Sequence, residues 1–170
     1  MFYSNQHDNA LPFQFIALLT RRDIILDMIE KAKEVEKRIG REVILITERT
    51  VHSDRHIFAL MHHSKGNINE LGMIAYDLWN ERFSKESKVD KTIYIIAPPD
   101  CCLDRIRIRG RVGEDAIDLG YLQECQAAHD SFFGSVISKN NHMIIDTSKH
   151  HYSTEEYSQL VDDVINYFRN

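Results

Sequence analysis

The apolar run Val43-Ile44-Leu45-Ile46-Thr47 leads directly into Glu48-Arg49-Thr50-Val51-His52-Ser53-Asp54-Arg55-His56-Ile57-Phe58. The run is continuous rather than alternating, which is typical of a strand whose two faces are both covered. Two acids and two arginines follow it, and open α/β sheets bind their ligands at the carboxyl ends of strands. We therefore expect an α/β fold with a ligand site that begins at Glu48.

Two later apolar runs, at residues 92–97 and His142–Asp146, have the same strand character. Apolar residues at helical spacing lie between and around the three runs. They predict helices over residues 13–39, 69–83, 100–109 and 119–138, and a last helix after the capping-box pattern Ser153-Thr154-Glu155-Glu156. Strands that alternate with helices predict a parallel sheet with crossover helices.

The composition, with 43% hydrophobic and 28% charged residues, is that of a single well-buried domain over residues 1–170. The formal net charge of −5 argues against a nucleic-acid or membrane partner, and no apolar stretch has bilayer-spanning length. Three cysteines, Cys101, Cys102 and Cys125, fit no disulfide or metal framework, which suits a reducing compartment. We expect a cytoplasmic protein.

The charged residues after the first run have two interpretations each. Glu48 could hold a hydrated magnesium ion and Arg49 could bind phosphate or hydroxyl oxygens. Alternatively, these two residues form an ion pair with each other, or Glu48 is an acid at a helix N-terminus. Asp54 could accept hydrogen bonds from a sugar-like ligand, or it could pair with Arg55 on a solvated face.

Arginines alternate with apolar residues in Arg105-Ile106-Arg107-Ile108-Arg109-Gly110-Arg111. The alternation alone would suit a strand, but Pro98-Pro99-Asp100 is a helix start signal and Gly110 a stop, so we expect a helix. On a helix Arg105 and Arg109 share a face and repel each other unless an anion such as a polyphosphate lies between them. The alternative is a solvated basic face that neighbouring acids balance.

Gln14 and the histidine pair His52 and His56 are further candidates. An amide among apolar neighbours needs partners if it is buried, and its donor and acceptor edge suits a nucleobase; the alternative is a partly exposed glutamine. The two histidines have the i, i+4 spacing that can bind a metal, although no third ligand has a fixed spacing to them. An unrelated α/β protein with a metal-binding histidine pair is therefore a further hypothesis.

Together these motifs resemble the deoxynucleoside kinase family, which includes the deoxycytidine, deoxyguanosine and insect-type multisubstrate kinases. The resemblance runs nearly end to end. Phe13-Gln14 followed by Arg21 is similar to the family's Phe-Gln helix, and residues 48–58 are similar to its Glu-Arg-Ser-Val-Tyr-Ser-Asp-Arg-Tyr-x-Phe block. Residues 105–111 resemble the arginine-rich lid over the donor phosphates. The implied fold is a P-loop-kinase-like parallel sheet with flanking helices.

The resemblance implies a deoxynucleoside-binding set. Its members would be Phe13, Gln14, Arg21, Asp54, Phe58, Glu114 and Tyr121. Gln14 and Asp54 would face the base, Arg21 would lie near its far side, and Phe58 would stack on it. Glu114 would bind the sugar 3′-hydroxyl, and Tyr121 would supply the following aromatic contact.

The resemblance also implies the reaction, which transfers the γ-phosphoryl of ATP or another nucleoside triphosphate to a deoxynucleoside 5′-hydroxyl. The implied catalytic residues are Glu48, Arg49, Arg109 and Arg111. Glu48 would hold Mg²⁺ through water, and Arg49 would steady the 5′-oxygen. Arg105 would join Arg109 and Arg111 in the donor-phosphate lid, and Asp146 would belong to the loop that brackets the donor's base. A homodimer, which is common in the family, is also implied.

The chain departs from the family pattern in three places. Gly113-Glu114 stands where the family has paired acids, and His52 and His56 replace tyrosines, which bears on sugar and base preference. No Gly-x-x-x-x-Gly-Lys-Ser/Thr motif occurs among the seven glycines. The first two strands and the first helix of the family fold have no counterpart here, and with them go the phosphate-cradling loop and the general-base carboxylate.

The missing first strand is central in the family's strand order, 2-3-1-4-5. Residues 43–47 and 92–97 would be its two neighbours, so we expect both to have unpaired edges and the chain alone to be unstable and catalytically inactive. A P-loop segment could come from a separate chain or an upstream reading frame, the two strands could close together, or the chain could be a decayed relic. The alternative function is a non-catalytic nucleoside-binding or interaction subunit derived from such a kinase.

Overall fold

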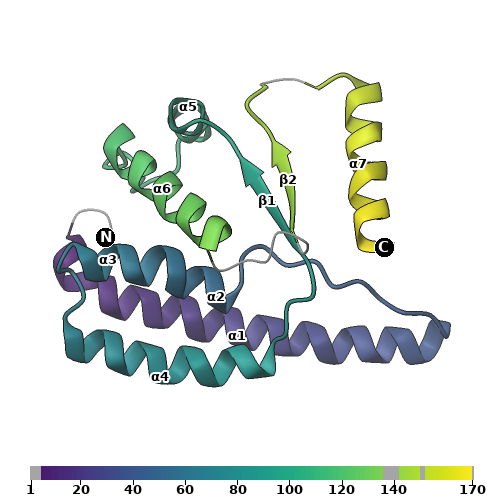
Figure 1. The fold of residues 1–170 in the computed structure, drawn as a ribbon, viewed down its shortest axis with the longest axis horizontal. Helices are drawn as coiled ribbons and strands as arrows, with labels where there is room; N and C mark the ends of the chain where they lie inside the picture. Colours follow the sequence, from purple (N-terminus) through teal and green to yellow (C-terminus); the bar gives the residue numbers. More distant parts are fainter. Residues whose placement is uncertain (1–4, 136–141, 150–151, 170) are drawn as a thin grey trace.

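The computed structural model describes residues 5–135, 142–149 and 152–169. A lower layer of helices carries an upper part built on a small sheet, as Figure 1 shows. The lower layer contains α1 (Gln6–Ile39), α2 (Val51–Ser53), the π-helix η1 (Asp54–Ala59), α3 (Leu60–Ser64) and α4 (Glu70–Glu86). The upper part contains β1 (Thr92–Ile96), α5 (Pro99–Arg109), α6 (Leu119–Ser135), β2 (His142–Asp146) and α7 (Thr154–Arg169).

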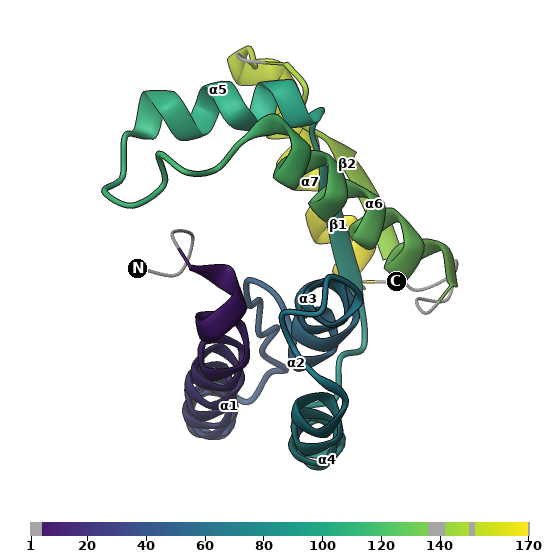
Figure 2. The same cartoon turned by 90° about the vertical axis from the view of Figure 1, so that its left-hand side faces the viewer.

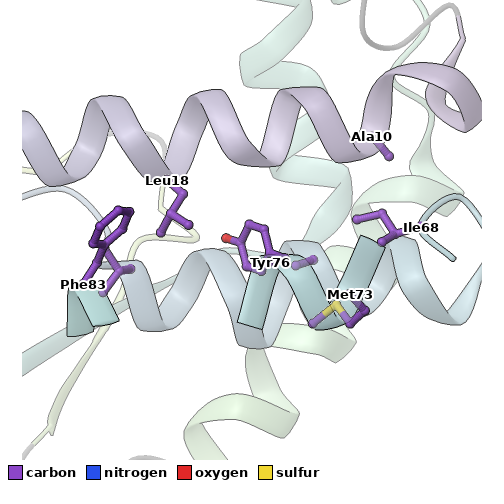
Figure 3. Close-up of a cluster of buried hydrophobic side chains, with 8 residues drawn as sticks. Ala10, Leu18, Ile68, Met73, Tyr76 and Phe83 are labelled. Carbon is purple, nitrogen blue, oxygen red and sulfur yellow. The ribbon is translucent and has the colours of Figure 1, made fainter. Parts of the chain in front are cut away.

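The helical layer has its own closed core between α1, α4 and the α2–η1–α3 segment. Buried residues of α1 recur on one face at Ala10, Gln14, Leu18 and Ile25, as expected where a helix packs along its length. Two of them belong to a buried cluster, part of which Figure 3 shows, that consists of Ala10, Leu18, Val51, Ala59, Ile68, Met73, Tyr76 and Phe83. This layer is therefore held together without help from the sheet.

The first helix begins at Gln6, seven residues earlier than the predicted start at residue 13. The Asn5 side chain accepts a hydrogen bond from the backbone N–H of Asp8 and so caps the helix. The predicted end is confirmed, since Gly40 adopts φ 67° and its N–H donates to the Glu36 carbonyl. The early cap adds nearly two turns before Gln14.

The two strands form a parallel pair in which Thr92 lies opposite His142 and Ile96 opposite Asp146, as the sequence predicts. On one face Tyr94 stacks on Phe133 of α6, with ring centroids 4.0 Å apart. At the start of β1, the Tyr167 hydroxyl of α7 donates a hydrogen bond to the Thr92 carbonyl and so attaches α7 to the strand. Ile145 is buried, but its neighbour across the ladder, Ile95, is 62% exposed.

The predicted strand at residues 43–47 is wrong. The segment is irregular and forms the long connection between α1 and α2 in Figure 1. Strand geometry depends on pairing, and in the described part of the chain the sheet has two strands only, β1 and β2. Ile44 and Ile46 are 54% and 62% exposed. The hypothesis that this segment closes directly onto residues 92–97 is wrong for the same reason.

The other predicted helices are confirmed as α4 to α7, apart from residues 136–138, which lie outside the described residues. The arginine cluster is helical up to Arg109, where Gly110 caps α5 with φ 61°. The capping box also forms: the Ser153 N–H donates to the Glu156 carboxylate and the Glu156 N–H to the Ser153 hydroxyl. None of the helices in the described ranges is long and apolar enough to cross a membrane.

Candidate functional site

An ion pair between α1 and η1 forms the centre of the candidate site. The Arg21 Nε lies 2.6 Å from the Asp54 Oδ2, and the Asp54 side chain is only 2% exposed. Arg21 also donates from Nη1 to the Glu48 carbonyl at 2.7 Å. Burial raises the pKa of Asp54, while the charge and hydrogen bond of Arg21 and the charge of Arg49 act to lower it. One arginine thus holds α1, Glu48 and the start of η1 together.

The alternative pairing of Asp54 with Arg55 is not what the structure contains. Arg55 instead makes a bidentate pair with Asp77 of α4, at 2.7 and 2.8 Å. Because neighbouring residues of η1 point to different partners, Asp54 is left facing α1. A capping box between Thr50 and Ser53 fixes the entry into these helices.

Gln14 is buried, at 3% exposure, so the interpretation as a partly exposed glutamine is wrong. It lies two turns before Arg21 and therefore on the same face of α1. A neutral amide and a charged pair consequently share this side of the helix. Phe13, its neighbour, points elsewhere and is 42% exposed.

Arg49 connects the site to α6. Its backbone has φ 63°, a left-handed conformation that is costly for a residue with a side chain. Its guanidinium lies 4.3 Å from the ring centroid of Phe58, which meets His129 of α6 edge to face at 5.9 Å. Burial lowers the pKa of His129, and the charge of Arg49 acts in the same direction. The chain thus holds a guanidinium over an aromatic ring beside the buried pair.

Glu48 is exposed, and its carboxylate makes no ion pair within the described residues, so the mutual pair with Arg49 is absent. A hollow of about 340 Å³ opens beside it between α1 and residues 46–49. Arg21, Glu48 and Arg49 form its polar side, and Ile24, Met28 and Ile46 its apolar side. A single exposed carboxylate at such a rim fits a hydrated Mg²⁺, which keeps most of its waters.

The arginines of α5 have protein partners in this structure. Arg105 donates to the carbonyl oxygens of Thr147 and Lys149 and so ties α5 to the segment after β2. Arg109 pairs with Glu114 at 2.8 Å, whereas Arg111 is exposed. The expected repulsion between Arg105 and Arg109 is therefore relieved by carbonyl oxygens on one side and a carboxylate on the other.

The remaining predicted residues lie on α6 and β2. Tyr121 is at the start of α6, with the Lys65 ammonium 5.8 Å from its ring centroid. Asp146 ends β2, and its carboxylate accepts from the Ser148 N–H at 2.8 Å, a bond that lowers the pKa of Asp146. Both residues are placed by regular elements rather than by loops.

The histidine pair does not form a metal clamp. The Nδ1 of His56 lies 2.9 Å from the His52 carbonyl oxygen, and the His56 ring stacks on Phe132. No group of three metal-ligating side chains occurs in the part of the chain that the structure describes.

Comparison with known proteins shows the family of the chain. The model of the deoxynucleoside kinase family matches residues 1–169. The chain belongs to the deoxynucleoside kinase family. Deoxycytidine kinases of Mus musculus and Homo sapiens are each 34% identical over 137 residues, which cover 78% of this chain and 51% of each relative. The mitochondrial deoxyguanosine kinase of Xenopus laevis is 33% identical over 96 residues, 54% of this chain and 36% of that protein.

A solved structure shows the same fold. The deoxyadenosine kinase from M. mycoides with bound dATP matches with a TM-score of 0.68 at 21% identity, over 97% of this chain and 78% of that one. The predicted fold class, a P-loop-kinase-like α/β fold, is confirmed. The hypothesis of an unrelated metal-binding protein is wrong. The chain spans about half the length of the curated deoxycytidine kinases it matches.

Within this kinase-family fold the predicted residues fall into two groups. Arg21 contacts Asp54, and Arg49 contacts Phe58. The charge of Arg49 acts on Asp54, and Gln14 lies on the same face of α1 as Arg21. The residues of α5 and β2 that are predicted to act on the donor belong to the upper part, which Figure 2 shows standing apart from α1 and α4. The sequence prediction missed His129, because its only connection to the predicted site in the sequence is its position eight residues after Tyr121 on the same helix.

Proposed function

We propose that this chain carries the acceptor half of a deoxynucleoside kinase site. The observation that carries the proposal is the buried Arg21–Asp54 pair on the same side of α1 as the buried Gln14. Such a set offers both donors and acceptors to the edge of a nucleobase. Arg49 and Phe58 border it with a cation and an aromatic face.

The proposed reaction is transfer of the γ-phosphoryl of ATP or another nucleoside triphosphate, with Mg²⁺, to a deoxynucleoside 5′-hydroxyl. Glu48 would hold the metal through water and Arg49 would stabilise charge on the transferred group. Arg105, Arg109 and Arg111 would act on the donor phosphates, with Asp146 near the donor's base. Glu114 and Tyr121 would bind the sugar, which requires the Arg109–Glu114 pair to separate.

Phosphoryl transfer in this fold depends on a lysine and backbone amides around the donor phosphates. No described residues form such a cradle, so the proposal includes a P-loop-bearing segment from outside these 170 residues. The exposed Ile95 on β1 and the unpaired, apolar residues 43–47 support it. A chain that binds nucleosides yet stays inactive with such a segment would instead be the non-catalytic binding subunit.

Isothermal titration of the chain with deoxycytidine, deoxyadenosine, deoxyguanosine and thymidine tests the acceptor site. We expect at least one to bind, and Gln14→Leu to weaken that binding about tenfold, because the variant loses hydrogen bonds to the base. Gln159→Leu, a change at an exposed glutamine of α7, is the matched control and should leave affinity unchanged. Absence of binding for all four nucleosides would refute the proposal.

We also propose a homodimer through the outer sides of α1 and α4. The two helices pack together, yet both expose large apolar side chains, among them Ile16, Leu19, Leu71, Ile74, Leu78 and Trp79. Exposed apolar residues gathered on one pair of helices are typical of an association surface.

The cytoplasmic location remains a prediction, which the three free thiols support.

The dimer is tested by Leu78→Glu, at a side chain that is 68% exposed. A charge desolvated at the centre of an apolar interface should weaken association by about 100-fold or more. Size-exclusion chromatography with light scattering should give the mass of a monomer for Leu78→Glu and that of a dimer for the wild type. Ile108→Glu, at an 82% exposed residue of α5, is the control that should remain dimeric. A monomeric wild type would contradict the proposal.

A further inference from the structure

Lys65 lies at the end of α3 and contacts α6, and no step of the proposed reaction uses it. Its ammonium forms an ion pair with the Glu124 carboxylate, and the two side chains are 32% and 47% exposed. The same ammonium lies 5.8 Å from the ring centroid of Tyr121, which is three residues before Glu124 and therefore on the same face of α6. Figures 1 and 2 both show α6 above α3. One cation of the helical layer thus contacts two side chains in the first turns of α6.

The backbone around Lys65 is fixed by a tight turn. The Lys65 N–H donates to the Met61 carbonyl, which completes the last turn of α3. Gly66 follows with φ 74°, a left-handed conformation that glycine adopts without strain, and its N–H donates to the His63 carbonyl at 2.9 Å. Because the side chain of Lys65 starts from a closed turn, its ammonium reaches α6 from a defined point.

The helix α6 contacts the helical layer both near its start and toward its end. Toward the end, His129 and Phe132 make aromatic contacts with η1. Near the start, Lys65 joins α6 to α3. The residues Tyr121 and His129 are about 12 Å apart along the helix. A helix that is attached only toward one end can pivot there, so the contacts of Lys65 fix the direction of the turn that carries Tyr121.

The Tyr121 side chain is also tied to its own helix. The Tyr121 N–H donates to the Asp118 carboxylate at 2.7 Å, at the start of α6. Burial raises the pKa of Cys125, one turn later, and a hydrogen bond with the Tyr121 side chain acts to lower it. Because the ring is held by its own helix, its place relative to the helical layer depends on how α6 is attached to α3.

We propose that Lys65 is a positioning residue that holds Tyr121 at the sugar side of the acceptor site, through its ion pair with Glu124 and its contact with the Tyr121 ring. The sugar in this statement rests on the proposed function, whereas the attachment of α6 does not. A partly exposed ion pair and a cation near an aromatic ring are each weak interactions. Their loss should therefore weaken ligand binding several-fold without unfolding the chain.

The test compares Lys65→Met, which removes the cation and keeps an unbranched side chain, with the wild-type chain. Without nucleoside, hydrogen exchange followed by NMR should be about threefold to fivefold faster for the amides of residues 122–125 and unchanged for those of residues 129–133. Calorimetry with the four deoxynucleosides should show affinity about threefold to fivefold weaker for the one that the wild type binds most tightly. Lys65→Arg, which keeps the cation, should match the wild type in both measurements.

A double-mutant cycle separates positioning of Tyr121 from general support of the fold. In a chain that already carries Tyr121→Leu, adding Lys65→Met should not weaken deoxynucleoside binding further, because the residue through which Lys65 acts is gone. Lys85→Met is the matched control, since it removes a lysine of α4 that pairs with Glu81 at 2.9 Å. It should change neither exchange in α6 nor affinity.

Two results would overturn the positioning role of Lys65. One is an equal loss of affinity from Lys65→Met with and without Tyr121, and the other is a Lys65→Met variant with the exchange and affinity of the wild type. A wild type that binds none of the four deoxynucleosides, with exchange at residues 122–125 still faster in Lys65→Met, overturns the proposed function and retains the attachment of α6 by Lys65.

Discussion

Replacing Arg21 with alanine is expected to destabilise the chain by about 3 kcal/mol at pH 7 and to abolish deoxynucleoside binding. The variant leaves the Asp54 carboxylate buried without its hydrogen-bonded cation, and breaking a buried pair in this way typically costs about 3–5 kcal/mol. We take the lower end because Arg49 still favours the charge. Urea unfolding followed by circular dichroism measures the loss, and calorimetry with deoxycytidine measures the binding.

The destabilisation should depend on pH in a defined direction. Burial already raises the folded-state pKa of Asp54 above its unfolded value, and without Arg21 the rise is larger. A raised folded-state pKa means that the folded chain binds the proton more tightly, so stability increases as the pH falls through that pKa. We therefore expect the deficit of Arg21→Ala to shrink between pH 7 and pH 4.5.

Two further variants identify the carboxylate as the cause. Asp54→Asn should cost less than Arg21→Ala, because the remaining guanidinium is 22% exposed and still binds the Glu48 carbonyl. The double variant Arg21→Ala with Asp54→Asn should recover most of the lost stability, since no buried charge remains. Equal deficits at pH 7 and pH 4.5, or no recovery in the double variant, would contradict a buried pair that holds the site together.

Most residues of the candidate site could be proposed from the sequence because they lie in short, local sequence patterns. Residues 48–58 and the Phe13-Gln14 pair are short sequence patterns, and the structure buries Gln14 on α1 and Asp54 on η1. Partners distant in sequence could not be predicted in the same way. Sequence proximity suggests Arg55 as the partner of Asp54, whereas its actual partner, Arg21, lies 33 residues away. Which helix face turns inward is decided by packing rather than by spacing.

The strand prediction failed at residues 43–47 for a related reason. Apolar, β-branched composition signals that a segment suits a sheet, but a strand forms only when a neighbour supplies the hydrogen bonds. Residues 92–96 have similar composition and do form a strand, because β2 lies alongside them. Two segments of similar composition therefore differ in structure, because a neighbouring strand is present beside one and absent beside the other.

Adding a P-loop-bearing segment that supplies a neighbouring strand should give the largest change in activity. From the chain alone we expect no phosphoryl transfer from ATP to deoxycytidine above background. With a segment made of a strand, a Gly-x-x-x-x-Gly-Lys-Ser/Thr loop, its helix and a second strand that carries the general-base carboxylate, we expect a rate at least about 10³-fold above that background. The first strand would pair with the free edge of β1 and the loop would supply the lysine and amides at the donor phosphates. Coexpression followed by a radiolabelled transfer assay measures the gain.

The gain should depend on the loop and on the β1 edge separately. A segment whose loop lysine is replaced by alanine should bind the chain but restore almost no transfer. Ile95→Lys places a charge on the exposed face of β1, which discourages strand pairing, and should weaken association of the segment. Ile39→Lys, at a 49% exposed residue near the far end of α1, should leave association unchanged. Transfer by the chain alone would contradict the need for the segment, and equal association for Ile95→Lys would exclude the β1 edge as its docking site.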